Sequence, residues 1–230
     1  MSRQKSITTS FVSIFLLMFV SVSLFAAGKE AASNAATDDF HEGFEYYALA
    51  TPQVTQAAKG TVEVVELFWY GCPHCFRFEP TLKKWLKTKP KNVTFVRVPA
   101  VFPRWPGAEI HARAYYSAVS LKVVSKVHQA LFDQIQRQKM VITQAQIKAI
   151  FVGEGVSSAN FDKVFASEAV NNLIIAGKKL AKGYEASSVP LVIVAGKYKA
   201  GADLVDGSFE KLLVLAEFLV KKELASSAKK

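Results

Sequence analysis

The chain has 230 residues, of which 50% are hydrophobic, and it carries a formal net charge of +10 at pH 7. This length is enough for one domain, or for one domain with a sizeable insertion, and the apolar content excludes a chain that is disordered throughout. The basic residues are scattered and belong to no nucleic-acid-binding motif. We therefore interpret the charge as solvated helix faces and a basic tail, and we expect no nucleic-acid partner.

Residues 1–27 have the pattern of a secretory signal peptide, in which a short basic start precedes an apolar tract. We expect cleavage at the end of this tract. The alternative is an uncleaved membrane anchor, because the tract is only slightly shorter than the ~20 residues that span a bilayer. Residues 28–39 are small and polar and are predicted to form a flexible lead-in. Export predicts an oxidising compartment, where cysteine pairs can persist.

Two strand signals follow the lead-in. Residues 45–49 are predicted to form a short strand, which ends before Pro52. The apolar run over residues 62–70 is rich in β-branched and aromatic side chains and predicts a buried central strand. Gly71 ends this run, and Pro73 suits the first turn of a helix because its φ is fixed and its missing N–H is not needed there.

A helix is therefore predicted over residues 73–86, followed by a further strand over residues 93–98 that Pro99 ends. This strand–helix–strand order is typical of a βαβ unit. The side chains expected on the inner face of the helix are Phe76, Leu82, Trp85 and Leu86.

From residue 108 to residue 182 the pattern becomes helical, with apolar side chains at helical spacing and glycines at the breaks. Thr143 and Gln146 have the spacing of a capping box at the start of one of these helices. We interpret the apolar and aromatic residues of this region as the core of a compact helical subdomain rather than as a cofactor site.

Sheet signals return near the end of the chain. Residues 191–194 are an apolar run, and the Ala-Gly pair at 195–196 predicts a tight hairpin turn into another strand. Ser208 is a candidate N-cap for a final amphipathic helix over residues 209–224.

Together these elements predict an α/β protein with a thioredoxin-like fold that is interrupted by an inserted helical subdomain. We place the two parts of the thioredoxin fold at residues 40–104 and 178–226, the insertion at residues 105–177, and a short tail at residues 227–230.

Cys72 and Cys75 are the only cysteines of the chain, and they fall at the mouth of the predicted helix and one turn inside it. A bond between them would close a tiny loop and constrain the unfolded chain little, so we interpret the pair as a working redox disulfide rather than a structural one. The unsatisfied N–H groups and the positive dipole end of the helix favour a thiolate at Cys72. Cys72 is therefore predicted to be the exposed nucleophile, and Cys75 its buried partner.

Metal binding and haem attachment are weaker interpretations of the same cysteines. A structural zinc site needs about four ligands, whereas His41, His111 and His128 show no ligand spacing relative to the pair. A c-type haem would need a histidine directly after Cys75, where Phe76 stands. We expect no metal and no diffusible cofactor.

The residue between the cysteines bears on the direction of the reaction. His74 can carry a positive charge or donate a hydrogen bond to the Cys72 sulfur, and either would stabilise the reduced form. Stabilising that form by ~4 kcal/mol makes the couple more oxidising by roughly 90 mV, whereas a helix terminus supplies ~1–2 kcal/mol. His74 and the loop amides must therefore contribute if the protein is an oxidant. The alternative is that His74 is merely an exposed turn residue.

The motif Cys72-Pro73-His74-Cys75 resembles the active site of the DsbA-type thiol:disulfide oxidoreductases of the thioredoxin superfamily. The resemblance covers most of the chain after the predicted signal peptide, and it combines the motif with the helical insertion and a late Val-Pro pair. The flanking segments that are also similar are Glu66-Leu67-Phe68, Phe78-Glu79, Val189-Pro190 and Gly196-Lys197-Tyr198.

The resemblance implies a role for each of several residues. Cys72 attacks and Cys75 is its buried partner, while Pro190 is a cis-proline beside the disulfide. A cis bond there would leave the backbone of Val189 free to pair with an extended substrate. From the residues alone, an ordinary trans proline at the start of a strand is equally compatible.

Three charged residues are assigned in the same way. Glu66 lies inside an apolar strand, and the resemblance makes it a buried acid that relays a proton for Cys75. A solvent-facing carboxyl is the alternative. Glu79 and Arg97 are possible members of a charge relay, with Arg97 at a position where the family usually has lysine; otherwise both are surface charges.

The sequence thus predicts a periplasmic enzyme that donates its Cys72–Cys75 disulfide to unfolded exported proteins through a mixed disulfide. The resemblance implies reoxidation by a quinone-linked membrane partner of the DsbB type, and we expect a monomer. One alternative is a reductase or isomerase kept reduced by a membrane donor. The other is a non-catalytic metallochaperone.

Overall fold

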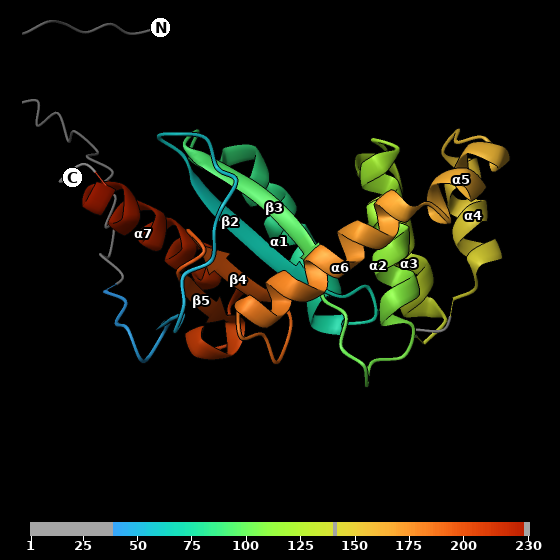
Figure 1. Cartoon of the computed structure of the whole chain (residues 1–230). Helices are drawn as coiled ribbons and strands as arrows, with labels where there is room; N and C mark the ends of the chain where they lie inside the picture. The colour runs from blue at the N-terminus through green and yellow to red at the C-terminus, as the bar shows by residue number, and fades with distance from the viewer. Residues whose placement is uncertain (1–38, 140–141, 228–230) are drawn as a thin grey trace, which may run out of the picture. The chain divides into compact units, whose positions relative to one another are not determined.

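The computed structural model has a five-stranded mixed sheet with the strand order β1-β5-β4-β2-β3. Figure 1 labels four of these strands, β2, β3, β4 and β5. The structure describes residues 39–139 and 142–227, so the predicted signal peptide, nearly all of the lead-in and the last three residues of the tail lie outside the described residues. The strands are β1 (Tyr47–Ala48), β2 (Val62–Phe68), β3 (Val93–Pro99), β4 (Leu191–Val194) and β5 (Tyr198–Gly201).

The predicted βαβ unit is confirmed. β2 pairs in parallel with β3, and α1 (Pro73–Thr88) connects them. Every residue of β2 is buried, as expected of a strand with covered neighbours on both faces. β4 runs antiparallel to β2 on its other side, so β2 is enclosed within the sheet.

The hairpin between β4 and β5 forms where the sequence predicts it. Ala195 and Gly196 have φ values of 56° and 63°, which is the positive-φ pair that a tight hairpin turn requires. A side chain at Gly196 would meet the backbone oxygen of Gln53 at 2.2 Å, so the close approach of that segment also demands glycine. After β5, a short 3-10 helix (Ala202–Val205) leads to α7 (Phe209–Ser227), which Ser208 caps by accepting the Lys211 N–H at 3.1 Å.

The predicted helical insertion is confirmed between β3 and β4. The predicted capping box is present, because the Thr143 hydroxyl accepts the Gln146 N–H while the Gln146 side chain accepts the Thr143 N–H. α6 continues across residue 177, so the helix joins the insertion directly to the second part of the thioredoxin fold. The helices of the insertion are α2 (Ala108–Ser120), α3 (Val124–Arg137), α4 (Gln144–Gly153), α5 (Ser158–Phe165) and α6 (Glu168–Gly183).

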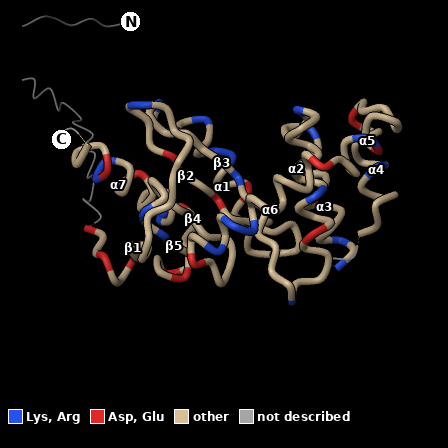
Figure 2. Tube along the Cα trace, in the orientation of Figure 1, with Lys and Arg blue, Asp and Glu red and all other residues tan. Residues whose placement is uncertain are grey.

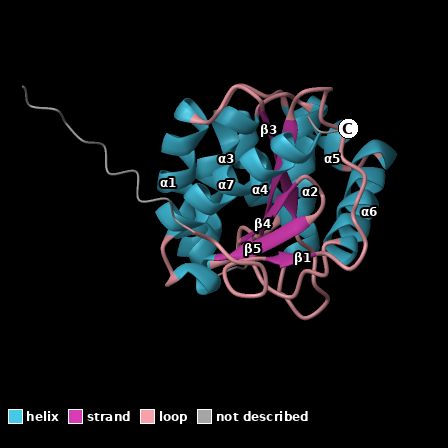
Figure 3. Cartoon of the chain, turned by 90° about the vertical axis from the view of Figure 1, so that its left-hand side faces the viewer, coloured by secondary structure: helices cyan, strands magenta, loops and turns pink. Residues whose placement is uncertain are grey.

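Helices cover both faces of the sheet (Figure 3). On one face α1 and α7 share an apolar core with β2 and β4, which includes Phe78, Leu82 and Leu215. On the other face the end of α6 packs on β2 and β4 through Ala181 and the following Tyr184. A third core fills the insertion and extends to the end of β2 and the start of α1.

The inner face of α1 differs from the prediction. Leu82 and Trp85 are buried as expected, but Phe76 and Leu86 are only partly buried, whereas Phe78 and Glu79 are buried. The reason is that α1 packs on two partners, with α7 on one side and α3 of the insertion on the other. The sequence pattern of one amphipathic face does not show this second partner.

Lys and Arg are interspersed with Asp and Glu along the described trace (Figure 2). Several of them form ion pairs at the surface, such as Lys148 with Asp162 and Lys178 with Glu109. No helix among the described residues combines the length and the apolar character needed to cross a bilayer.

The packing of α7 predicts a position-dependent loss of stability. Leu215 is 0% exposed and its neighbour Val214 is 46% exposed. Leu215→Ala should lower the free energy of unfolding by about 2–5 kcal/mol because it leaves a cavity in the core. Val214→Ala is the matched control and should change it by about 0.5 kcal/mol or less. Urea denaturation of the reduced protein measures both values, and equal losses would contradict the packing described here.

Candidate active site

The two cysteines lie at the start of α1, where the chain turns sharply after β2. Cys72 is the N-cap residue, and its sulfur accepts the backbone N–H of Cys75 at 3.4 Å. Pro73 occupies the first turn, as predicted. A side chain at Gly71 would meet the ring of Trp69 at 2.3 Å, so glycine leaves room for this ring beside the motif. Both cysteines are free thiols, which is the reduced form of the predicted redox pair.

The two thiols have opposite electrostatic environments. The pKa of Cys72 is lowered to about 7 by a hydrogen bond from the Cys75 thiol and by the backbone N–H groups of Cys75 and His74, although burial opposes this shift. Burial raises the pKa of Cys75 well above its ordinary value, and the neighbouring Cys72 sulfur adds to the effect. At neutral pH roughly half of Cys72 is therefore thiolate, compared with ~3% for a free cysteine.

The exposure of Cys72 is smaller than the sequence predicts. The residue is 8% exposed and Cys75 is 0% exposed, so Cys72 is the more accessible of the two without being open to solvent. The difference arises because the aromatic core of the insertion and the partly buried Val189 pack around the start of α1. An attacking sulfur must reach Cys72 through this small exposed fraction.

Val189 and Pro190 lie directly beside the dithiol, although they are more than a hundred residues away in sequence. The Cys72 thiol donates to the Val189 carbonyl at 3.4 Å, and the Val189–Pro190 peptide bond is cis. The sheet explains this contact, because β4 begins at Leu191 and pairs with β2, whose end leads into the motif.

His74 makes a different contact from the one predicted. Its imidazole Nδ1 accepts a hydrogen bond from the Arg77 guanidinium at 3.1 Å. What reaches the Cys72 sulfur is the backbone N–H of His74 rather than its ring. The His74 side chain is exposed, and its ring is held by Arg77.

Glu66, Glu79 and Arg97 come together in one buried cluster behind the cysteines. Arg97 Nε donates to Glu66 Oε2 at 2.9 Å, and Arg97 Nη2 donates to both oxygens of Glu79 at 3.2 Å. The parallel pairing of β2 and β3 places Glu66 opposite Arg97. All three side chains are largely buried, which removes the alternative of surface charges.

The two carboxyls of this cluster are not equivalent. Burial raises the pKa of Glu66 to about 8, against the opposing influence of Arg97. Glu66 Oε1 has no hydrogen-bond partner among the described residues, which fits a protonated acid. Burial also opposes ionisation of Glu79, but hydrogen bonds from His128 and Arg97 outweigh it and lower the pKa of Glu79.

Sequence analysis missed two residues of this cluster. His128 of α3 contacts Tyr70 Oη through Nδ1 at 2.7 Å and Glu79 Oε1 through Nε2 at 3.2 Å. His128 was considered only as a metal ligand, but its spacing from Phe132 and Ile135 places it on the buried face of α3. Among the described residues, no group of three His, Cys, Asp or Glu side chains is arranged to hold a metal ion.

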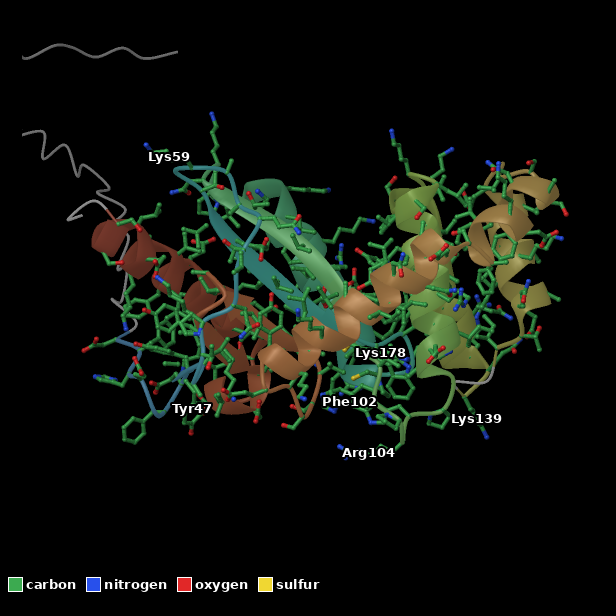
Figure 4. All side chains as sticks on the ribbon, in the orientation of Figure 1. Tyr47, Lys59, Phe102, Arg104, Lys139 and Lys178 are labelled. Carbon is green, nitrogen blue, oxygen red and sulfur yellow. The ribbon has the colours of Figure 1, made fainter. Side chains whose placement is uncertain are left out.

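An aromatic surface borders the motif. Trp69 donates to His111 Nδ1 at 2.9 Å, and its ring stacks on Trp105 with the ring centroids 4.7 Å apart. Trp105 in turn contacts the ring of Phe102, with centroids 4.3 Å apart. Phe102 and the exposed Arg104 belong to the loop after β3, and both are labelled in Figure 4.

Comparison with known proteins gives relatives along nearly the whole chain. The family model of the DSBA-like thioredoxin domain matches residues 97–213. The thiol:disulfide interchange protein DsbA of Pseudomonas syringae pv. tomato is 39% identical over 212 residues, which are 91% of this chain and 97% of that protein. The DsbA of Pseudomonas aeruginosa is 36% identical over 218 residues, which are 94% of this chain and 98% of that protein.

Solved structures agree with these sequence relatives. The crystal structure of Pseudomonas aeruginosa DsbA superimposes with a TM-score of 0.76 at 37% identity and covers 84% of this chain and 99% of that chain. The oxidoreductase DsbA from Xylella fastidiosa gives a TM-score of 0.73 at 29% identity, with 81% and 98% of the two chains covered.

A thioredoxin-type sheet that presents an asymmetric dithiol at a helix start therefore defines this protein as a thiol:disulfide oxidoreductase. Within that class the chain belongs to the DsbA family of thiol:disulfide interchange proteins, because its identity to family members extends over almost their full length.

The burial of Glu66 predicts a pH dependence of stability. Its pKa is about 8 in the folded protein and ~4.3 in an unfolded chain, so between these values the folded state binds more protons. Stability must then fall as the pH rises through this window. Glu66→Gln removes this titration. As the pH rises, the free energy of unfolding of the variant should therefore increase relative to that of the wild type, by up to about 1.4 kcal/mol per pH unit. Denaturant titrations of the two reduced proteins from about pH 5 to about pH 8 measure the difference. Parallel stability curves would show that Glu66 is ionised throughout.

Proposed function

We propose that this chain is an exported dithiol oxidase of the periplasm, which donates the Cys72–Cys75 disulfide to unfolded proteins. The observation that carries the proposal is the asymmetry of the two thiols. The hydrogen bonds and N–H groups around Cys72 favour its thiolate, whereas Cys75 is buried as a thiol. A folded protein that stabilises the reduced dithiol makes the couple more oxidising. Transfer of the disulfide to a substrate is then favoured.

The reaction follows from the positions of the two sulfurs. A substrate thiolate attacks Cys72 in the disulfide, the bond to Cys75 breaks, and Cys75 leaves as a thiolate. Glu66, protonated at neutral pH, is the acid in this cluster that can return a proton to Cys75. A second substrate thiolate then attacks the substrate sulfur of the mixed disulfide and releases Cys72. Two electrons pass from the substrate dithiol to the protein, and Cys72 leaves readily because its thiolate is stabilised.

The neighbours of the dithiol suggest how a substrate is held. The Val189 carbonyl already accepts a hydrogen bond from Cys72, so backbone groups of the Val189–Pro190 segment lie within reach of a chain joined to that sulfur. An extended, unfolded segment exposes the backbone groups that such a contact needs. Pro73 and His74 contribute through the backbone of the first turn, which positions the sulfur.

Partners and location are inferred from family membership and from the sequence pattern of residues 1–27. The relatives named above are thiol:disulfide interchange proteins called DsbA. We propose unfolded exported proteins as substrates and a DsbB-type membrane protein as the reoxidant, with the enzyme acting as a monomer. The dithiol itself carries the electrons, so the exchange step uses no diffusible cofactor.

The redox equilibrium of the purified protein with glutathione tests the direction of transfer. The protein should remain mostly reduced in buffers that oxidise thioredoxin, because its reduced form is stabilised. Thioredoxin in the same buffers is the control. A strongly reducing potential would instead identify a reductase or isomerase kept reduced by a membrane donor. Stoichiometric zinc or copper without thiol exchange would identify a metallochaperone.

A further inference from the structure

A continuous chain of hydrogen bonds joins the inserted subdomain to the buried cluster behind the cysteines. It begins at Tyr70, just after β2, and passes through His128 of α3 to Glu79 of α1. From Glu79 it continues through Arg97 of β3 to Glu66 of β2. Among the five residues that these hydrogen bonds join, only His128 belongs to the insertion, and it is buried.

Chemistry dictates the direction of each hydrogen bond. Glu79 also accepts from Arg97, so its carboxylate can only accept from His128, and the proton must be on Nε2. Nδ1 of a neutral imidazole then accepts, and Tyr70 donates to it. Two shifts agree with this arrangement: burial lowers the pKa of His128, and burial raises the pKa of Tyr70 well above its ordinary value. His128 is thus neutral at pH 7 with a fixed tautomer.

One guanidinium is shared by two carboxyls, and their other contacts differ. Glu79 receives hydrogen bonds from Arg97 on both of its oxygens and a further one from His128. Glu66 receives only the hydrogen bond from Arg97, and its second oxygen has no partner among the described residues. In such a pair, the carboxyl that accepts more hydrogen bonds ionises first. Its negative charge then disfavours ionisation of the other carboxyl. The hydrogen bond from His128, together with the slightly greater exposure of Glu79, therefore makes the two carboxyls unequal.

We propose that His128 is a positioning residue of the dithiol site: its Nε2–H holds Glu79 as the ionised carboxyl beside Arg97 and thereby leaves the exchangeable proton on Glu66. Glu66 is the carboxyl whose charge acts on both Cys72 and Cys75. Through this side chain the insertion contributes to the chemistry of the thioredoxin-type dithiol.

The groups that face His128 set the conditions of the test. Tyr70, Glu79 and Tyr115 approach it from the segment after β2, from α1 and from α2, and Arg97 acts on it from β3. Phe68 and Phe132 complete its surroundings with apolar rings. Of these groups, only Glu79 and Arg97 are charged at neutral pH, so a change at His128 reaches Glu66 through them.

The test is the pH dependence of the glutathione redox equilibrium, because its slope counts the protons that are taken up with the two electrons. A Glu66-linked inflection is expected near pH 8 in the wild type. In His128→Leu it should move to lower pH by about one unit or more, because Glu79 loses its donor and Arg97 then favours ionisation of Glu66. His128→Asn should behave likewise, because its shorter amide reaches only the Nδ1 position. This polar variant keeps the test available if the Leu variant fails to fold.

Three further single variants and one double variant separate positioning from packing. His128→Gln can still donate to Glu79 and should keep the wild-type inflection, whereas Glu66→Gln should lose it. Glu79→Gln should shift the inflection to lower pH as His128→Leu does. The double variant that combines His128→Leu with Glu79→Gln should shift it no further, because both changes act on the Glu79 carboxylate. An unmoved inflection in His128→Leu or His128→Asn, or a shift in His128→Gln as large as that in His128→Leu, would overturn the proposal.

This inference rests on the proposed function only in assigning exchange to the Cys72–Cys75 pair. The two can fail separately. A reducing potential of the wild-type protein would overturn the donor assignment, whereas the role of His128 is read only from differences between variants measured in the same buffers.

Discussion

The site depends on the hydrogen bonds that the sulfur of Cys72 accepts at the start of α1, from the Cys75 thiol and from backbone N–H groups. These groups are free to bind a sulfur because the first turn of a helix leaves them without internal partners. They are aimed at Cys72 because this residue is the N-cap and Pro73 begins the helix. The remainder of the fold preserves this geometry: β4 brings Val189 to the same sulfur, and the insertion covers Cys75. The unequal reactivity of two identical side chains follows from their places along one helical turn.

Much of this arrangement could be predicted from the sequence, because it is encoded locally. The buried run of β2, the helix start at Pro73 and the hairpin at residues 195–196 depend on neighbouring residues, and all three occur where they were predicted. The helical insertion was predicted from its change of periodicity. The placement of Val189 and Pro190 beside the cysteines required the family resemblance, because nothing local in the chain connects segments so far apart.

The rest could not be predicted because it depends on packing between distant elements. The burial of Glu79 arises from the contact of α1 with α3, which no pattern within α1 reveals. The role of His128 requires Tyr70, Glu79 and α3 to meet in space. The ring of His74 turned toward Arg77, so the predicted side-chain donor to Cys72 is replaced by a backbone N–H. In each case the residue type was noticed, but its partner was decided by tertiary structure.

The pH titration of the Cys72 thiolate tests the central claim most directly. Thiolate absorbance of the reduced protein, followed together with mapping of the first cysteine to be alkylated, reports the pKa and identifies the sulfur. We expect a pKa of about 7 at Cys72, with Cys75 unlabelled until Cys72 has reacted. A pKa of ~8.5, the value of free cysteine, or labelling of Cys75 first would contradict it.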